Sequence, residues 1–159
     1  MTQQETEALA PLRLSVLVGR PPAHAFRVFT EGIGTWWPLE THSVGEGGAE
    51  NVELESRVGG QIVETIMGGD EAVWGTILAF EPPHRLVFDW HPGYEPGAPK
   101  TEIEVRFTPE GEGTRVELEH RGWERLADRG PEARLSYEEG WAYVFGRLYA
   151  EAAATGDGT

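Results

Sequence analysis

The sequence predicts an α+β fold in which a curved antiparallel sheet of about seven strands wraps around one long C-terminal helix. Two observations carry this prediction. Between residues 51 and 120 apolar and polar side chains alternate, and short Gly- and Pro-rich turns separate the alternating runs. From about Pro131 to Ala153 the apolar residues recur every three or four positions, as in an amphipathic helix. The connections between strands are too short for parallel crossovers, so the sheet should be antiparallel.

A first strand and two short helices are predicted ahead of this sheet. Residues 12–18 alternate between apolar and polar, with one leucine on the polar side. Pro22 then suits the first turn of a helix. Glycines interrupt that helix, and a short turn carries Trp36 and Trp37. The Gly-rich run Ser43–Ala49 is predicted to be a loop.

The segment from Val73 to Trp90 is the clearest hairpin, because Pro82 and Pro83 end one strand and begin the reversal. Strands are predicted at residues 51–58, 61–67, 71–80, 85–91, 102–107 and 115–120. One face of this sheet is charged and the other apolar, and the last helix is long enough to cover the apolar face. A wedge-shaped space between sheet and helix is the expected ligand site.

Composition restricts the protein class. We expect one domain over 1–159, with frayed tails at 1–10 and 154–159. Hydrophobic residues at 39% and charged residues at 25% indicate a globular protein. The net charge of −14 disfavours nucleic acid and anionic membranes as partners. No cysteine occurs, which excludes disulfides and Cys-bound metals. The start of the chain lacks the apolar core of a secretion signal, so we expect a cytoplasmic protein.

Carboxylate pairs such as Glu102/Glu104 and Glu117/Glu119 share a strand face with arginines, which favours cross-strand ion pairs over acid/base chemistry. Asp89 and His91 also share a face, but no third ligand stands at a metal-binding spacing. We therefore expect no metal site and no cofactor.

Two residues are weak candidates for catalysis. Strand parity places His120 on the apolar face, where an imidazole is a core residue, a polar group inside a cavity or a general base. Glu64 stands between Ile62 and Ile66, although Val63 favours the opposite face nearly as well. The other residues expected to line a ligand cavity are aromatic or apolar: Trp36, Trp37, Phe88, Trp90, Val105, Leu118, Tyr137, Trp141 and Val144.

The motifs that run along the chain resemble one family. They are Trp36-Trp37, Arg57-Val58-Gly59-Gly60, Trp74-Gly75, Phe80-Glu81-Pro82-Pro83, Leu86-Val87-Phe88-Asp89-Trp90, Gly113-Thr114-Arg115-Val116, His120-Arg121-Gly122-Trp123 and Gly140-Trp141. In this order they resemble the START-like (SRPBCC) superfamily with the helix-grip fold. Within it, the chain is similar to the branch named after the activator of the heat-shock-protein-90 ATPase.

This resemblance implies the helix-grip fold but leaves the activity open, because the superfamily contains carriers, receptors, cyclases and co-chaperone domains. The leading expectation is a module that binds a small hydrophobic or aromatic molecule, as a monomer or homodimer. A co-chaperone with a chaperone partner is the second expectation, implied by the branch alone. A cyclase- or dehydratase-type enzyme using the same cavity is the third.

Overall fold

A computed structural model of the chain describes residues 10–39, 48–91 and 100–155. Their sheet has seven strands in the order β1-β7-β6-β5-β4-β3-β2, and every pairing is antiparallel. The strands are β1 (Leu12–Val18), β2 (Ala49–Leu54), β3 (Gln61–Ile66), β4 (Glu71–Glu81), β5 (Arg85–Trp90), β6 (Thr101–Glu110) and β7 (Gly113–Arg121). The strand that alternation predicted at residues 12–18 is β1, and it pairs with the last strand, β7.

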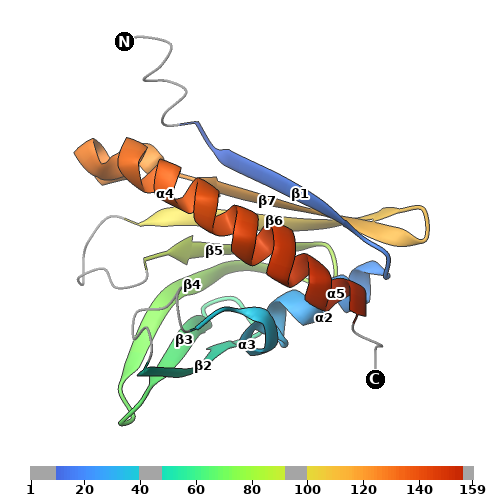
Figure 1. The fold of residues 1–159 in the computed structure, drawn as a ribbon, viewed down its shortest axis with the longest axis horizontal. Helices are drawn as coiled ribbons and strands as arrows, with labels where there is room; N and C mark the ends of the chain where they lie inside the picture. Colours follow the sequence, from blue (N-terminus) through green and yellow to red (C-terminus); the bar gives the residue numbers. More distant parts are fainter. Residues whose placement is uncertain (1–9, 40–47, 92–99, 156–159) are drawn as a thin grey trace.

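The helical segments are α2 (Pro22–Thr30), α3 (Ile33–Trp36), the 3₁₀ segment η2 (Trp123–Arg129), α4 (Gly130–Tyr143), the π-helical segment η3 (Val144–Tyr149) and α5 (Ala150–Thr155). The last three are continuous and form one long helix. Figure 1 shows this helix lying across one face of the sheet, with α2 and α3 beside its C-terminal half. The predicted α+β helix-grip architecture is confirmed.

The start and end of β2 differ from the expected strand. It begins at Ala49, inside the predicted loop, and it ends at Leu54 rather than at residue 58. A tight turn follows, in which the Gly60 N–H donates to the carbonyl of Arg57 over 3.0 Å and Gly59 adopts φ of +84°. Only glycine takes that conformation readily, so the Gly59-Gly60 pair ends the strand earlier than alternation suggested.

The long helix buries Trp141 and Val144, as the spacing predicted, but its last two turns bury a different stripe from the one expected. The three- to four-residue spacing predicted that Val144 and Leu148 face the sheet, with Phe145 and Tyr149 beside them. The structure instead fully buries Phe145 and Tyr149 and leaves Leu148 half-buried. A π-helical turn closes i→i+5 hydrogen bonds and holds more residues than an α-turn. The segment η3 therefore rotates the following residues about the helix axis. The Tyr149 hydroxyl then donates to the Ala25 carbonyl on α2 over 2.7 Å.

Trp123 lies in the core. Its side chain is fully buried at the start of η2, and its indole N–H donates to the His120 carbonyl over 3.0 Å. Gly122 adopts φ of +94°, which turns the chain after β7 back toward the interior and brings Trp123 there.

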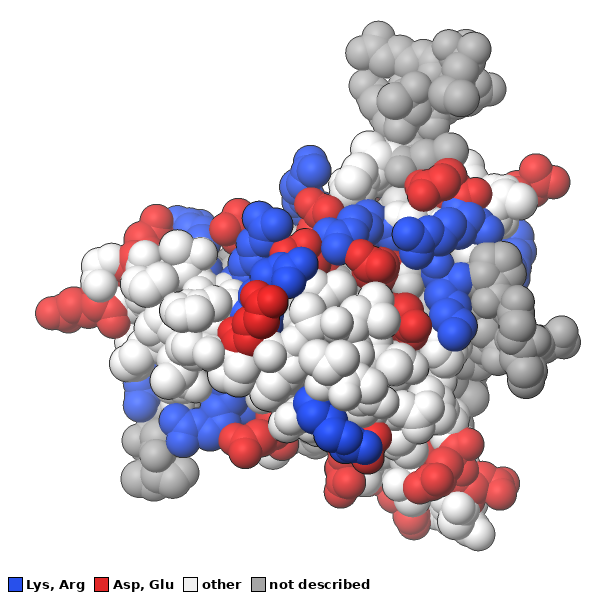
Figure 2. Space-filling view, turned by 180° about the vertical axis from the view of Figure 1, so that it is seen from behind, with Lys and Arg blue, Asp and Glu red and all other residues white. Residues whose placement is uncertain are grey.

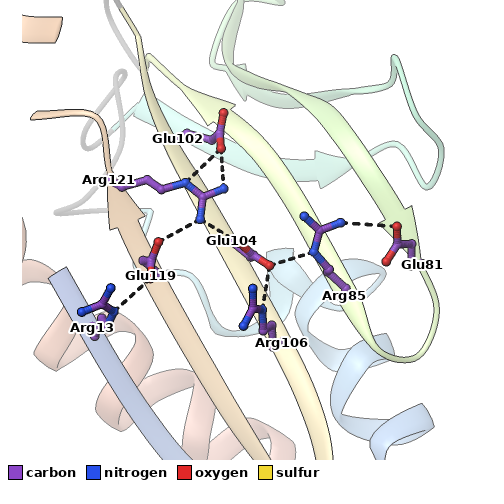
Figure 3. A network of polar contacts seen from close by, with 8 residues as sticks. All are labelled: Arg13, Glu81, Arg85, Glu102, Glu104, Arg106, Glu119 and Arg121. Atoms are coloured by element: carbon purple, nitrogen blue, oxygen red, sulfur yellow. Dashed lines mark hydrogen bonds and ion pairs between the residues drawn. The ribbon is translucent and has the colours of Figure 1, made fainter. Parts of the chain in front are cut away.

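The outer face of the sheet carries a network of ion pairs that joins five adjacent strands, β1, β7, β6, β5 and β4 (Figure 3). Glu104 accepts hydrogen bonds from Arg85, Arg106 and Arg121, each at 2.7 Å. Burial opposes ionisation of Glu104, but these three hydrogen bonds outweigh it and lower the pKa of its carboxyl to about 2. The remaining members are Arg13, Glu81, Glu102 and Glu119.

The sequence favoured cross-strand ion pairs over acid/base chemistry for the paired carboxylates, and these contacts agree with that interpretation. Figure 2 views the molecule from behind and shows arginine and acidic side chains intermixed over this face. Next to Arg13 and Arg106 lies a shallow hollow of about 340 Å³, which opens to solvent and is also lined by Ser15 and Glu117. It is on the opposite side of the sheet from the long helix, so it is separate from the site expected between them.

Candidate functional site: an aromatic cluster between sheet and helix

Aromatic side chains from four regions of the chain meet on the inner face of the sheet, under the long helix. The ring centroids of Trp37 and Trp74 are 4.8 Å apart, and Trp74 lies 5.7 Å from Trp90. Trp141, from α4, lies 5.7 Å from Trp37 and 5.8 Å from Trp90. All four indoles are buried. Separations of this size put the rings in edge or tilted contact, so the four indoles form one continuous cluster.

His120 anchors one side of this cluster by two hydrogen bonds. Its Nδ1 lies 3.0 Å from the indole Nε1 of Trp141, and its Nε2 lies 2.7 Å from Oγ1 of Thr101. An indole N–H can only donate, so Nδ1 is the acceptor and the ring proton is on Nε2. The Thr101 hydroxyl therefore accepts from Nε2–H and donates to the Trp90 carbonyl, 3.4 Å away.

This arrangement keeps the imidazole of His120 neutral. Its side chain is fully buried, and burial lowers the pKa of His120 to about 3. Both ring nitrogens are engaged by other side chains. For His120 to act as a general base, one of these hydrogen bonds must first be exchanged for a ligand. Strand parity allowed His120 to be a core residue, a polar group inside a cavity or a general base. The geometry favours the first of these, a core residue that joins the sheet to the helix.

Tyr137 and Trp90 form a second link between helix and sheet. The Trp90 indole N–H donates to the Tyr137 hydroxyl over 3.0 Å. The Tyr137 ring also lies 5.0 Å from the His120 ring and 5.8 Å from Trp123. Tyr137 is half-buried, whereas the rings that it contacts are buried. It therefore stands at the edge of the cluster.

Glu64 and Trp74 form a polar pair on the other side of the cluster. The side chain of Glu64 is fully buried, and its Oε1 accepts the Trp74 indole N–H at 2.8 Å. Strand β3 presents Ile62 and Glu64 to the interior. Of the two faces that the sequence left open for Glu64, the structure shows the inner one.

The predicted cavity residues lie together in the core between the inner face of the sheet and the helices, although their role in ligand binding stays a prediction. Trp36 contacts Trp37 with ring centroids 5.7 Å apart, and Phe88 contacts Trp90 at 5.8 Å. Val105 and Leu118 face each other across β6 and β7 in the same core. The remaining predicted residue, Val144, is buried at the start of η3.

The pair formed by Asp89 and His91 at the end of β5 lies apart from this cluster. Nε2 of His91 is 3.4 Å from Oδ1 of Asp89, and the same oxygen accepts the Thr76 backbone N–H at 2.8 Å. Within residues 10–39, 48–91 and 100–155, no three His, Asp or Glu side chains form a group able to hold a metal ion. Asp89 thus braces the junction of β4 and β5.

Two members of the site were missed by sequence reasoning. Thr101 gave no signal, because only the register of β6 and β7 brings its hydroxyl to His120. Trp74 could not be assigned to a face. The register of β4 shifts against both of its neighbours, so alternation fails along this strand.

The chain belongs to the family of activator of Hsp90 ATPase homolog 1-like proteins, whose sequence model matches residues 20–153. The fold is that of the START-like (SRPBCC) superfamily expected from the motifs. No curated protein matches the chain significantly. Among the described residues, none of the helices is both long enough and apolar enough to cross a membrane.

Solved structures resemble the chain over most of its length. An anthrahydroquino-gama-pyrone synthase, Txn09, solved in complex with SUM, is 33% identical, with a TM-score of 0.60 over 91% of this chain and 94% of that one. CalU16 from Micromonospora echinospora is 26% identical, with a TM-score of 0.50 over 90% and 83%. Protein MLL2253 from Mesorhizobium loti is 17% identical, with a TM-score of 0.63 over 90% and 96%, and shows the shared fold alone.

Proposed function

We propose that the protein binds a small planar aromatic molecule between the inner face of the sheet and the long helix. The observation that carries this proposal is the indole cluster of Trp37, Trp74, Trp90 and Trp141, which includes buried hydrogen-bonding groups. Apolar and aromatic walls with a few well-placed polar groups are characteristic of small-molecule sites. Indole rings offer flat surfaces on which another aromatic ring can stack.

The 33% identity to Txn09 supports the same ligand class, since the product named for that synthase is a fused aromatic ring system. It also favours a second candidate function, a ring-forming enzyme that acts on such a molecule in the same site. The residues with suitable chemistry would be Glu64 and, after exchange of a hydrogen bond, His120. Mass spectrometry of aromatic polyketide precursors incubated with the protein tests this: a new cyclised product, lost in Glu64→Gln, is expected.

The co-chaperone alternative rests on the name of the family. Its test is the ATPase rate of a bacterial chaperone of the Hsp90 class. A change in that rate at saturating protein would support the alternative, and an unchanged rate would dispose of it.

Titration calorimetry with 1,8-dihydroxyanthraquinone tests the binding proposal. We expect saturable binding to the wild type and at least about tenfold weaker binding to Trp37→Leu, because that substitution removes a ring in contact with four other indoles. Leu135→Ala, on the exposed side of α4, is the matched control and should bind like the wild type. Equal affinity in all three proteins would place the dye elsewhere and contradict the proposal.

A further inference from the structure

The hollow on the outer face of the sheet lies over strands β1, β6 and β7. Its volume of about 340 Å³ is at the lower end of the range for small-molecule sites, and its charged lining consists of Arg13, Glu104, Arg106, Glu117 and Glu119. Two of these carboxylates are already paired with arginines. Glu104 accepts from three of them, and Glu119 accepts from Arg13 and Arg121. The hollow therefore meets a ligand mainly with its other charged groups.

The two arginines of the hollow each leave the far end of the guanidinium open. Nε of Arg13 donates to Glu119 over 2.9 Å, and Nε of Arg106 donates to Glu104 over 2.7 Å (Figure 3). Among the residues that the structure describes, neither guanidinium has a further partner. The two terminal nitrogens of a guanidinium can hold a carboxylate through two parallel hydrogen bonds.

Glu117 supplies a carboxylate that is open in the same way. Its register partners are Arg106 on β6 and Ser15 on β1. Opposite charges in register usually pair across strands, but Arg106 turns to Glu104 instead. The Ser15 hydroxyl accepts from Arg115. Within the described part of the chain, the exposed side chain of Glu117 makes no hydrogen bond or ion pair, so it can receive an ammonium group.

The register sets the spacing between these groups. Arg13 is in register with Glu119, and Glu119 is in register with Glu104, the partner of Arg106. Both guanidiniums therefore belong to one row across the strands. Glu117 lies two residues from Glu119 on the same face of β7, which separates the rows by roughly 7 Å. An extended chain of two residues spans about 7 Å, whereas a single residue spans about half of that.

We propose that the hollow binds a small zwitterion of dipeptide length, with its carboxylate on Arg13 and Arg106 and its ammonium group on Glu117. The net charge of −14 repels a purely anionic ligand, and the two arginines repel a purely cationic one. A zwitterion meets attraction at both of its ends. The hollow is on the opposite side of the sheet from the aromatic cluster, so this inference does not depend on the proposed function.

Four small compounds test the proposal on the wild type. Glycylglycine is the zwitterion, N-propionylglycine replaces its ammonium group by methyl, and glycylglycinamide replaces its carboxylate by an amide. Glycine carries both charges at half the distance. We expect glycylglycine to shift the backbone amide resonances of Ser15, Arg106 and Glu117 saturably, with at least about tenfold higher affinity than the other three at constant ionic strength. Equal or tighter binding of any of the other three, or no binding of glycylglycine, would overturn the proposal.

Glu117→Gln tests the ammonium position, because it keeps the shape of the side chain and removes its charge. We expect this variant to bind glycylglycine no more tightly than the wild type binds N-propionylglycine. Glu112→Gln is the matched control, since it removes the same charge from an exposed position in the turn between β6 and β7, outside the lining of the hollow. It should bind like the wild type. Unchanged affinity in Glu117→Gln would overturn the assignment of Glu117, and the comparison of compounds on the wild type decides the matter even if the variant fails to fold.

Discussion

The indole N–H of Trp141 on α4 donates a hydrogen bond to Nδ1 of His120 on β7, over 3.0 Å and across a buried interface. The bond fixes the tautomer of the imidazole and ties the long helix to the sheet. Trp141→Phe keeps an aromatic ring but removes the donor. We expect the free energy of unfolding to fall by about 1–3 kcal/mol, the usual result of leaving a buried acceptor unsatisfied. Urea unfolding measures this loss, and unchanged stability would show that the hydrogen bond is dispensable.

Acid should destabilise the fold through His120. Its pKa of about 3 in the folded protein lies below the ordinary value of 6.5, so the unfolded chain binds the proton more tightly. The stability gained by keeping this ring neutral is complete above pH 6.5 and is lost as the pH falls toward 3, by up to about 1.4 kcal/mol per pH unit.

The difference in unfolding free energy between wild type and His120→Gln isolates this effect, because the other histidines are common to both proteins. We expect the wild type to lose stability faster than the variant between pH 6.5 and pH 4.5. Parallel pH profiles would contradict the assignment of His120 as the buried neutral base.

Glu104 should be the most important member of the outer network. Its side chain is only 6% exposed and it accepts from three arginines, whereas Glu81 is 56% exposed and pairs with one arginine, Arg85, among the residues that the structure describes. We expect Glu104→Gln to cost about 1–3 kcal/mol and Glu81→Gln less than about 1 kcal/mol. Thermal unfolding at neutral pH checks the ranking, which similar losses in the two variants would contradict.

The effect of Glu104 should also depend on pH. The folded pKa of about 2 lies below the ordinary 4.5, so its contribution is complete above pH 4.5 and is lost as the pH falls toward 2. At pH 3 the gap in stability between wild type and Glu104→Gln should therefore be smaller than at pH 7.

Ala127 lies in a strained conformation, with φ of 52° and ψ of −126°, at the kink inside η2. Glycine adopts this region freely, so Ala127→Gly should raise the free energy of unfolding by about 1 kcal/mol. Ala142→Gly, at an exposed helical position of α4, is the matched control and should lower it by about the same amount. Destabilisation by both substitutions would show that Ala127 is not strained.

Local alternation was sufficient to predict the architecture. Along β1 and β7 every second residue faces inward, as with Val116, Leu118 and His120, because these strands pair without a register shift. Alternation failed along β4, where Trp74 and Ile77 are both buried although they lie three positions apart. Register shifts against β3 and β5 change which residues of β4 face inward, and the composition of the strand does not indicate these shifts.

The site could be predicted only in part, for a similar reason. The spacing of apolar residues predicted which rings face inward. The hydrogen-bonded pairs that give the site its chemistry, however, join residues that are distant in sequence. Thr101 reaches His120 through strand pairing, and Trp141 reaches it through the docking of a helix. Such contacts depend on tertiary packing, which periodicity does not encode.

The central claim is that an aromatic ligand binds at the indole cluster, and the indole N–H resonances of the tryptophans test it most directly. The chain has six tryptophans, so a ¹H–¹⁵N spectrum can follow each ring separately during titration with 1,8-dihydroxyanthraquinone. We predict saturable shifts for Trp37, Trp74, Trp90 and Trp141. Indole signals that stay unmoved while amides of the outer sheet face respond would contradict the account.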